Sequence, residues 1–137
     1  MPPRHVVDLP DYWLWLDRLI AQSGGYLESL ADLQVQLLED PAGDILRLLI
    51  PRQVLHFYDG TFLAFSLSVD HDLGTERYRF HFAQTGGELI WRLDKHRGHE
   101  NEDGGFTHIH EPGNVRRPHW EVDFEEVLAK IASKREP

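Results

Sequence analysis

Two spacings of apolar residues occur along the chain. The first, a repeat every three or four positions, predicts a helix near each end. The N-terminal helix begins after Asp8, whose side chain can cap free amides, has Pro10 in its first turn and stops at Gly24-Gly25. Its apolar stripe consists of Tyr12, Trp13, Leu16, Leu19 and Ile20. The C-terminal helix spans residues 121–134, has Asp123 as its cap, and carries a stripe of Phe124, Val127, Leu128 and Ile131.

The second spacing, an alternation of apolar and polar side chains, predicts strands between the helices. These strands cover residues 32–37, 45–57, 61–70, 77–82 and 89–94. Pro51 interrupts the second strand, and Asp59-Gly60 forms a hairpin turn after it. The buried face of the third strand is marked by Leu63, Phe65, Leu67 and Val69. We predict one α+β domain over residues 1–137, an antiparallel meander of about five strands with an N-terminal and a C-terminal helix packed on one face.

A turn at Thr85-Gly86 would fix the register of the last two strands. The large apolar side chains then share one face, in the pairs Phe82 with Leu89, Phe80 with Trp91 and Tyr78 with Leu93. The pairs on the opposite face are His81 with Ile90, Arg79 with Arg92 and Arg77 with Asp94. Because directly opposed arginines repel, this register requires an anion or an acidic side chain over Arg79 and Arg92.

Composition restricts the chemistry. The 137 residues include 14 Lys and Arg against 23 Asp and Glu, a net charge of −9, which argues against bulk attraction to nucleic acid or an anionic membrane. The absence of cysteine excludes disulfides, thiolate catalysis and cysteine-based metal sites, and it favours a cytoplasmic location. The sequence shows no signal-peptide pattern, membrane span, glycine-rich phosphate loop or Gly-x-Ser-x-Gly elbow.

The charge is unevenly distributed. Residues 1–76 hold four basic side chains against 12 acidic ones, whereas residues 77–119 hold seven against six, together with six of the nine histidines. The acidic total therefore conceals a near-neutral segment rich in groups that titrate near neutral pH. We expect the chemistry of the protein in this segment.

Three interpretations of the segment are open. In the first, histidines act as general acid and base in phosphodiester cleavage, while Arg79 and Arg92 hold the phosphate. In the second, zinc or nickel is held near Asp94 by His96, His99, His108 and His110. In the third, the histidine-rich loop is a solvated connection in a protein without activity.

Several motifs between about Val54 and Ile131 occur in a distinctive order. They are Asp59-Gly60, Tyr78-Arg79-Phe80-His81-Phe82, Leu89-Ile90-Trp91-Arg92-Leu93-Asp94, His99, His108-Ile109-His110 and Phe124-Glu125-Glu126-Val127-Leu128. This arrangement covers over half of the chain and resembles the TumE family of bacterial and archaeal toxins encoded beside an antitoxin. The resemblance implies a growth-inhibiting toxin with a cognate antitoxin protein as its partner. It ranks Asp94, His99, His108 and His110 first among the candidate residues.

The leading hypothesis is an RNA-directed toxin that acts as a metal-independent ribonuclease. In it Arg79 and Arg92 bind phosphate, and Asp94 orients an imidazole. The base that takes the proton of the attacking hydroxyl is His108 or His110, and the acid that protonates the leaving oxygen is His99 or His81. The alternative is a noncatalytic binding module whose histidine loop holds a metal or a partner. A second copy of the chain is a further candidate partner, and the helix aromatics Tyr12, Trp13 and Trp15 are the expected docking surface for an antitoxin.

Overall fold

The computed structural model describes residues 2–28, 32–96 and 107–135, and it has the predicted α+β architecture. Its two helices are α1 (Leu9–Gln22) and α2 (Phe124–Arg135). The strands in the described residues are β1 (Tyr26–Leu27), β2 (Gln36–Glu39), β3 (Ile45–His56), β4 (Thr61–Asp70), β5 (Thr75–Gln84), β6 (Leu89–Lys95), β7 (Thr107–Glu111) and β8 (Val115–Pro118).

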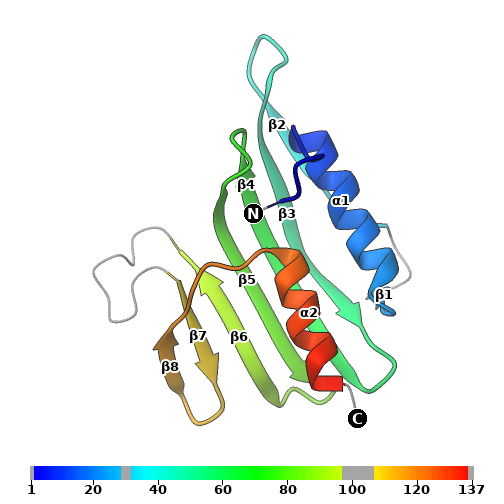
Figure 1. Ribbon diagram of the computed structural model, residues 1–137, viewed down its shortest axis with the longest axis vertical. Coiled ribbons are helices and arrows are strands. Elements are labelled where there is room, and N and C mark those ends of the chain that lie inside the picture. The colour runs from blue at the N-terminus through cyan, green and yellow to red at the C-terminus, as the bar shows by residue number, and fades with distance from the viewer. Residues whose placement is uncertain (1, 29–31, 97–106, 136–137) are drawn as a thin grey trace.

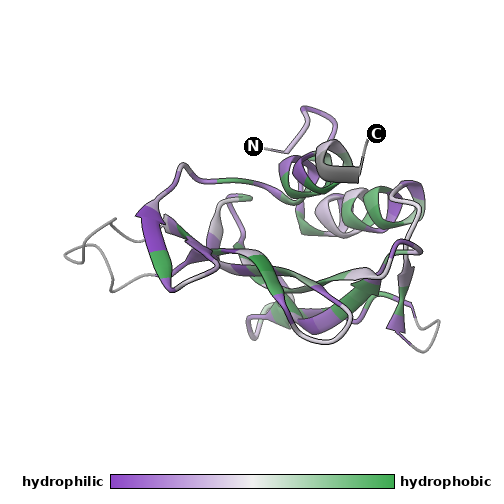
Figure 2. Cartoon of the chain, turned by 90° about the horizontal axis from the view of Figure 1, so that it is seen from below, coloured by the Kyte–Doolittle hydropathy of each residue, from purple (hydrophilic) through white to green (hydrophobic). Residues whose placement is uncertain are grey.

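The described strands form one antiparallel sheet in the order β1-β3-β4-β5-β6-β7-β8, and β2 pairs with the start of β3. Strands β2 to β6 form the predicted meander, although its first strand begins at Gln36 and not at Asp32. Strands β1, β7 and β8 give the sheet more strands than the roughly five expected. Both helices lie on the same face of this sheet, and no helix in the described residues covers its other face, called the open face below (Figures 1 and 2). No helix within the described ranges is long and apolar enough to cross a membrane.

Helix α1 begins as its sequence predicts but buries more of its surface. The Asp8 side chain accepts a hydrogen bond from the backbone N–H of Asp11 at 2.8 Å. Trp15, which the predicted apolar stripe omits, is 4% exposed and packs edge-on against Tyr12, which is 1% exposed. The helix contacts both β3 and α2. The predicted docking surface on α1 is therefore wrong for these two rings.

Helix α2 has the predicted cap and stripe. Asp123 Oδ1 accepts a hydrogen bond from the N–H of Glu126 at 2.9 Å, and Glu126 Oε1 accepts one from the N–H of Asp123 at 3.2 Å. The stripe residues Phe124, Val127 and Ile131 are buried in the core. Phe124 contacts Phe65 of β4 and Phe80 of β5, which places α2 over the middle of the sheet.

The register of β5 against β6 differs from the prediction by two residues. The apolar pairs are Phe82 with Trp91 and Phe80 with Leu93, and the outer pairs are His81 with Arg92 and Arg79 with Asp94. Gly86 and Gly87 both adopt positive φ in a longer turn, and a bulge follows between Phe82 and Ala83. A shift of two residues keeps each side chain on its predicted face but changes its partner. The predicted pairs Arg79 with Arg92 and Arg77 with Asp94 are therefore wrong.

The hairpin of β7 and β8 lies outside the strands that the sequence pattern predicts. Its turn contains Gly113 and Asn114, both with positive φ. Strand β7 pairs with β6, so that His108 lies opposite Asp94 and His110 lies opposite Arg92. This pairing brings the histidines of one candidate motif onto the same surface as the arginines of another.

Candidate functional site

The open face of β5, β6 and β7 carries a small array of charged and titratable side chains. Successive side chains of a strand point to opposite faces, so Phe80, Phe82 and Leu93 fill the core while their polar neighbours face outward. The register arranges the outward residues in two rows across the three strands. These rows are His81, Arg92 and His110, and beside them Arg79, Asp94 and His108.

Asp94 is the centre of this array. Its side chain is 2% exposed, and its two oxygens accept hydrogen bonds from Arg79 Nε at 3.1 Å and Arg92 Nε at 2.9 Å. Asp94 is thus the acidic side chain that the two neighbouring arginines require, although it comes from β6 itself and not from a loop. His110 Nε2 lies 3.1 Å from Asp94 Oδ2 without the alignment of a hydrogen bond. The carboxylate therefore fixes two guanidinium groups and contacts one imidazole.

Two of the outward histidines have lowered pKa values. Partial burial lowers the pKa of His81, and the positive charges of Arg92, Arg52 and Arg79 lower it further. Partial burial also lowers the pKa of His110, with Arg92 adding to the effect and Asp94 opposing it. Both imidazoles are therefore mainly uncharged at neutral pH and able to accept a proton.

His108 has a different environment. It is 4% exposed, and its ring meets that of His110 edge to face with centroids 4.9 Å apart. Because His110 keeps 23% of its side chain exposed, His110 is the better placed of the two to touch a ligand. The contact with His108 restricts the orientation of the His110 ring.

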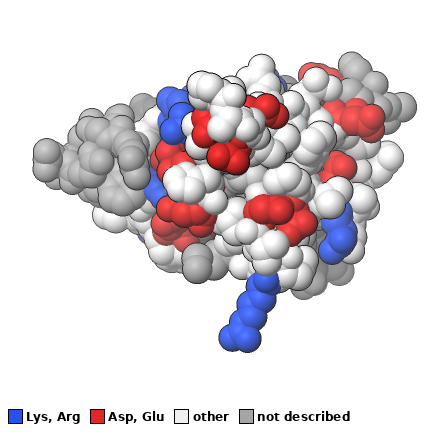
Figure 3. Space-filling model, turned by 90° about the horizontal axis from the view of Figure 1, so that it is seen from above, with Lys and Arg blue, Asp and Glu red and all other residues white. Residues whose placement is uncertain are grey.

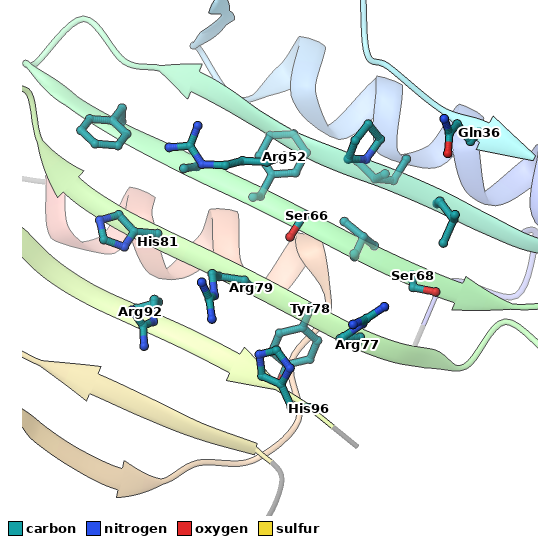
Figure 4. A pocket seen from close by; sticks show the side chains of 17 residues that line it. Gln36, Arg52, Ser66, Ser68, Arg77, Tyr78, Arg79, His81, Arg92 and His96 are labelled. Atoms are coloured by element: carbon teal, nitrogen blue, oxygen red, sulfur yellow. The ribbon is translucent and has the colours of Figure 1, made fainter. Parts of the chain in front are cut away.

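A groove of about 580 Å³ opens on the same face, over β3 to β6. Figure 4 shows Arg52, Arg77, Arg79 and Arg92 around it, with His81 and His96, on the side of the sheet away from the helices. The described residues that line it include no aspartate and no glutamate. Neither Arg52 nor Arg77 pairs with an acidic side chain in the described ranges. The groove can therefore receive an anion.

Arg52 and Arg77 were not predicted as site residues. Pro51 has no N–H for the ladder, and the strand bulges between Ile50 and Gln53, which places Arg52 over the groove. The interruption at Pro51 was the sequence signal for this bulge. Arg77 faces outward by the same alternation along β5 as Arg79 and His81, but the predicted register pairs it with Asp94.

The predicted metal ligands come together only in part. The donor atoms of Asp94, His108 and His110 lie within 4.8 Å of one another, close enough to hold one ion. His96 lines the arginine groove, and His99 lies outside the described residues. Each oxygen of Asp94 already accepts one guanidinium N–H, so an ion here would share the carboxylate with Arg79 and Arg92.

A family model described as toxin TumE matches residues 27–135, which is most of the chain. No curated protein and no solved structure matches. The matched range contains the whole sheet apart from Tyr26, together with the outward array, the groove and α2.

Proposed function

The chain belongs to the TumE toxin family, and we propose that it acts on RNA as a phosphodiester-cleaving toxin restrained by a cognate antitoxin protein. The observation that carries the proposal is the groove, where four arginines gather without a described carboxylate in its lining. A cluster of guanidinium groups with open hydrogen-bond donors is suited to phosphate.

The acidic character of the rest of the molecule favours RNA binding at this groove over binding elsewhere on the surface. The chain has a net charge of −9, and Figure 3 shows acidic side chains spread over the surface as seen from above, with few basic ones. A net negative charge repels a polyanion overall and leaves attraction to local clusters of basic side chains such as the groove. A toxin of this kind would bind RNA locally and would not coat it.

The row of His81, Arg92 and His110 supplies the parts of an acid–base reaction. Arg92 lies between the two histidines, on the strand that pairs with both of theirs. Neighbouring strands lie about 4.8 Å apart, so the two histidine backbones are separated by about 10 Å. A phosphate held by Arg92 would therefore have one imidazole on each side, as an in-line displacement at phosphorus requires.

In the proposed step the 2′-hydroxyl of RNA attacks the adjacent phosphorus. His110 takes the hydroxyl proton while the bond from phosphorus to the 5′-oxygen breaks, and protonated His81 gives its proton to that oxygen. The products are a 2′,3′-cyclic phosphate and a 5′-hydroxyl, and the two histidines have exchanged protonation states. Asp94 positions Arg92 and His110 through its contacts with both side chains.

The lowered pKa values suit the role of His110 as base better than the role of His81 as acid. His110 is ready as the base because its pKa is lowered. His81 must hold a proton, and its pKa is lowered by burial and by the arginines of the groove. A bound phosphate places negative charge among those arginines, which favours the protonated imidazole. Substrate binding would thus favour the protonated form of His81 that acts as the acid.

The His110→Gln variant tests the cleavage. We expect the wild-type protein to arrest growth on expression and, when purified, to cleave single-stranded RNA in EDTA with cyclic phosphate ends. The variant should lose about 10²–10⁴-fold in cleavage rate and lose toxicity, because it lacks the base. His71→Gln is the matched control, since His71 lies in an exposed turn. A folded His110→Gln protein that stays fully toxic would refute the assignment.

A second candidate function is a noncatalytic metal-binding module, favoured by the spacing of Asp94, His108 and His110. Elemental analysis of the purified protein distinguishes it from the ribonuclease. Stoichiometric zinc or nickel that is lost in His108→Ala would support the metal site. Trace metal together with cleavage in EDTA would support acid–base catalysis without a metal.

A further inference from the structure

A line of flat side chains crosses the open face from the edge of the sheet to the arginine groove. Tyr58 contacts Tyr26 with ring centroids 5.2 Å apart, and Tyr26 stacks on His56 at 5.5 Å. His56 contacts Phe62 at 6.3 Å, and Phe62 stacks on His81 at 6.2 Å. The line uses β1, β3, β4 and β5 in spatial order, with Tyr58 from the turn after β3.

These rings do not belong to the core. Leu55, Leu63 and Phe82 alternate with them and are fully buried on the helix side of the sheet. Tyr58 is 83% exposed and Tyr26 is 36% exposed, so the outer end of the line is accessible to solvent. Accessible aromatic side chains along one path are a feature on which single-stranded nucleic acids stack their bases.

The line continues directly into the phosphate groove. Phe62 and His81 line the groove together with Arg52, and His81 lies opposite Arg92 on the next strand. Flat rings and guanidinium groups therefore share one path, which matches the alternation of bases and phosphates in a nucleotide chain. Four strand spacings separate β1 from β6, about 19 Å at 4.8 Å each, which suits about four nucleotides.

We propose that this path, the Tyr58–Tyr26–His56–Phe62–His81 ladder, is a stacking platform for the unpaired bases of single-stranded RNA. The inference rests on the proposed function and names the form of its substrate. Duplex nucleic acid does not fit, because its base faces are occupied by stacking within the helix. The Glu28 carboxylate lies 3.4 Å from His56 Nε2, so the RNA phosphates lie away from this end and toward the arginines.

The test compares oligouridine with a ribose-phosphate chain of equal length that lacks bases, both labelled with fluorescein, by fluorescence anisotropy. We use the His110→Gln protein, so that the RNA is not cleaved. Oligouridine should bind at least tenfold more tightly than the abasic chain, and its affinity should rise up to about four nucleotides and then level off. The Tyr26→Ala/Tyr58→Ala variant should lose about tenfold or more for oligouridine and little for the abasic chain.

Trp120→Ala is the matched control, because Trp120 is 69% exposed but stacks on His119 outside the ladder. Equal binding of oligouridine and the abasic chain, or a tyrosine variant that binds like the wild type, would refute the platform. If tyrosine substitution leaves RNA affinity unchanged and prevents binding of the antitoxin, the face is a protein interface and the proposal is wrong.

The outcomes separate the platform from the proposed cleavage. If base-dependent binding is seen but His110→Gln remains toxic, the platform holds and the catalytic assignment fails. If the wild-type protein cleaves RNA, His110→Gln does not, and the tyrosine variant binds and cleaves normally, the catalytic assignment holds and the platform fails. If no RNA binds at all, both are wrong.

Discussion

The salt dependence of RNA binding tests whether the groove meets phosphates. The perturbation is Arg52→Gln/Arg77→Gln, which removes the two groove arginines that have no acidic partner in the described ranges. The Arg79–Asp94–Arg92 network stays intact, so this variant should fold normally. Because both side chains are exposed, neither substitution removes core packing.

The magnitude follows from the charges. Four guanidinium groups line the groove, and Asp94 neutralises one of them, which leaves three net positive charges. For single strands the slope of log affinity against log salt is about −0.7 for each phosphate neutralised, so the wild-type slope is about −2.1. One net charge remains in the variant, and its slope is about −0.7. Between 50 and 200 mM salt, wild-type affinity should fall about twentyfold and variant affinity about threefold.

The assay is fluorescence anisotropy with labelled oligouridine at four or more salt concentrations, on proteins that also carry His110→Gln. Arg4→Gln/Arg18→Gln is the control, because it removes the same net charge from exposed positions outside the groove. We expect its slope to match the wild type. Parallel lines for the groove variant and the wild type would show that Arg52 and Arg77 meet no phosphate and would refute the reasoning.

Three further predictions concern pH and stability. Cleavage needs His110 uncharged and His81 protonated, and both pKa values lie below the ordinary 6.5, so kcat/KM should peak on the acidic side of pH 6.5 and fall by pH 8. A value of kcat/KM that stays constant up to pH 8 would contradict these roles. Asp94→Asn leaves two guanidinium groups without their shared counterion, so urea titration should show a free energy of unfolding lower by about 3 kcal/mol. An unchanged urea midpoint would mean that the buried carboxylate contributes little to stability. Gly25→Ala would place a Cβ 2.7 Å from the His56 carbonyl oxygen, so thermal unfolding should show a stability lower by about 1–3 kcal/mol. A variant as stable as the wild type would show that the backbone here shifts to make room for the methyl group.

Much of the fold can be predicted because its signals are local. Alternation places Phe80 and Phe82 inward and Arg79 and His81 outward, and the structure confirms these faces. The caps at Asp8 and Asp123 form as their sequences indicate. Such features depend on residues a few positions apart, so the sequence determines them without knowledge of the packing.

The site depends on the pairing of residues that are far apart in the sequence, and no local pattern reports that pairing. The longer turn at Gly86 and Gly87 and the bulge after Phe82 set which residue faces Asp94, and the pairing of β7 with β6 brings His108 and His110 to the arginines. Likewise, only the packing of α1 against both β3 and α2 shows that Trp15 is buried.

The sequence by itself determined the two kinds of element, their inward and outward faces and the residue types available for chemistry. Tertiary structure alone decided the partners of Asp94, the placement of Arg52 over the groove and the continuity of the ring ladder with the arginines. The physical reason is that side-chain direction repeats with the local backbone geometry, whereas register is set jointly by turn length, bulges and pairing between strands distant in sequence.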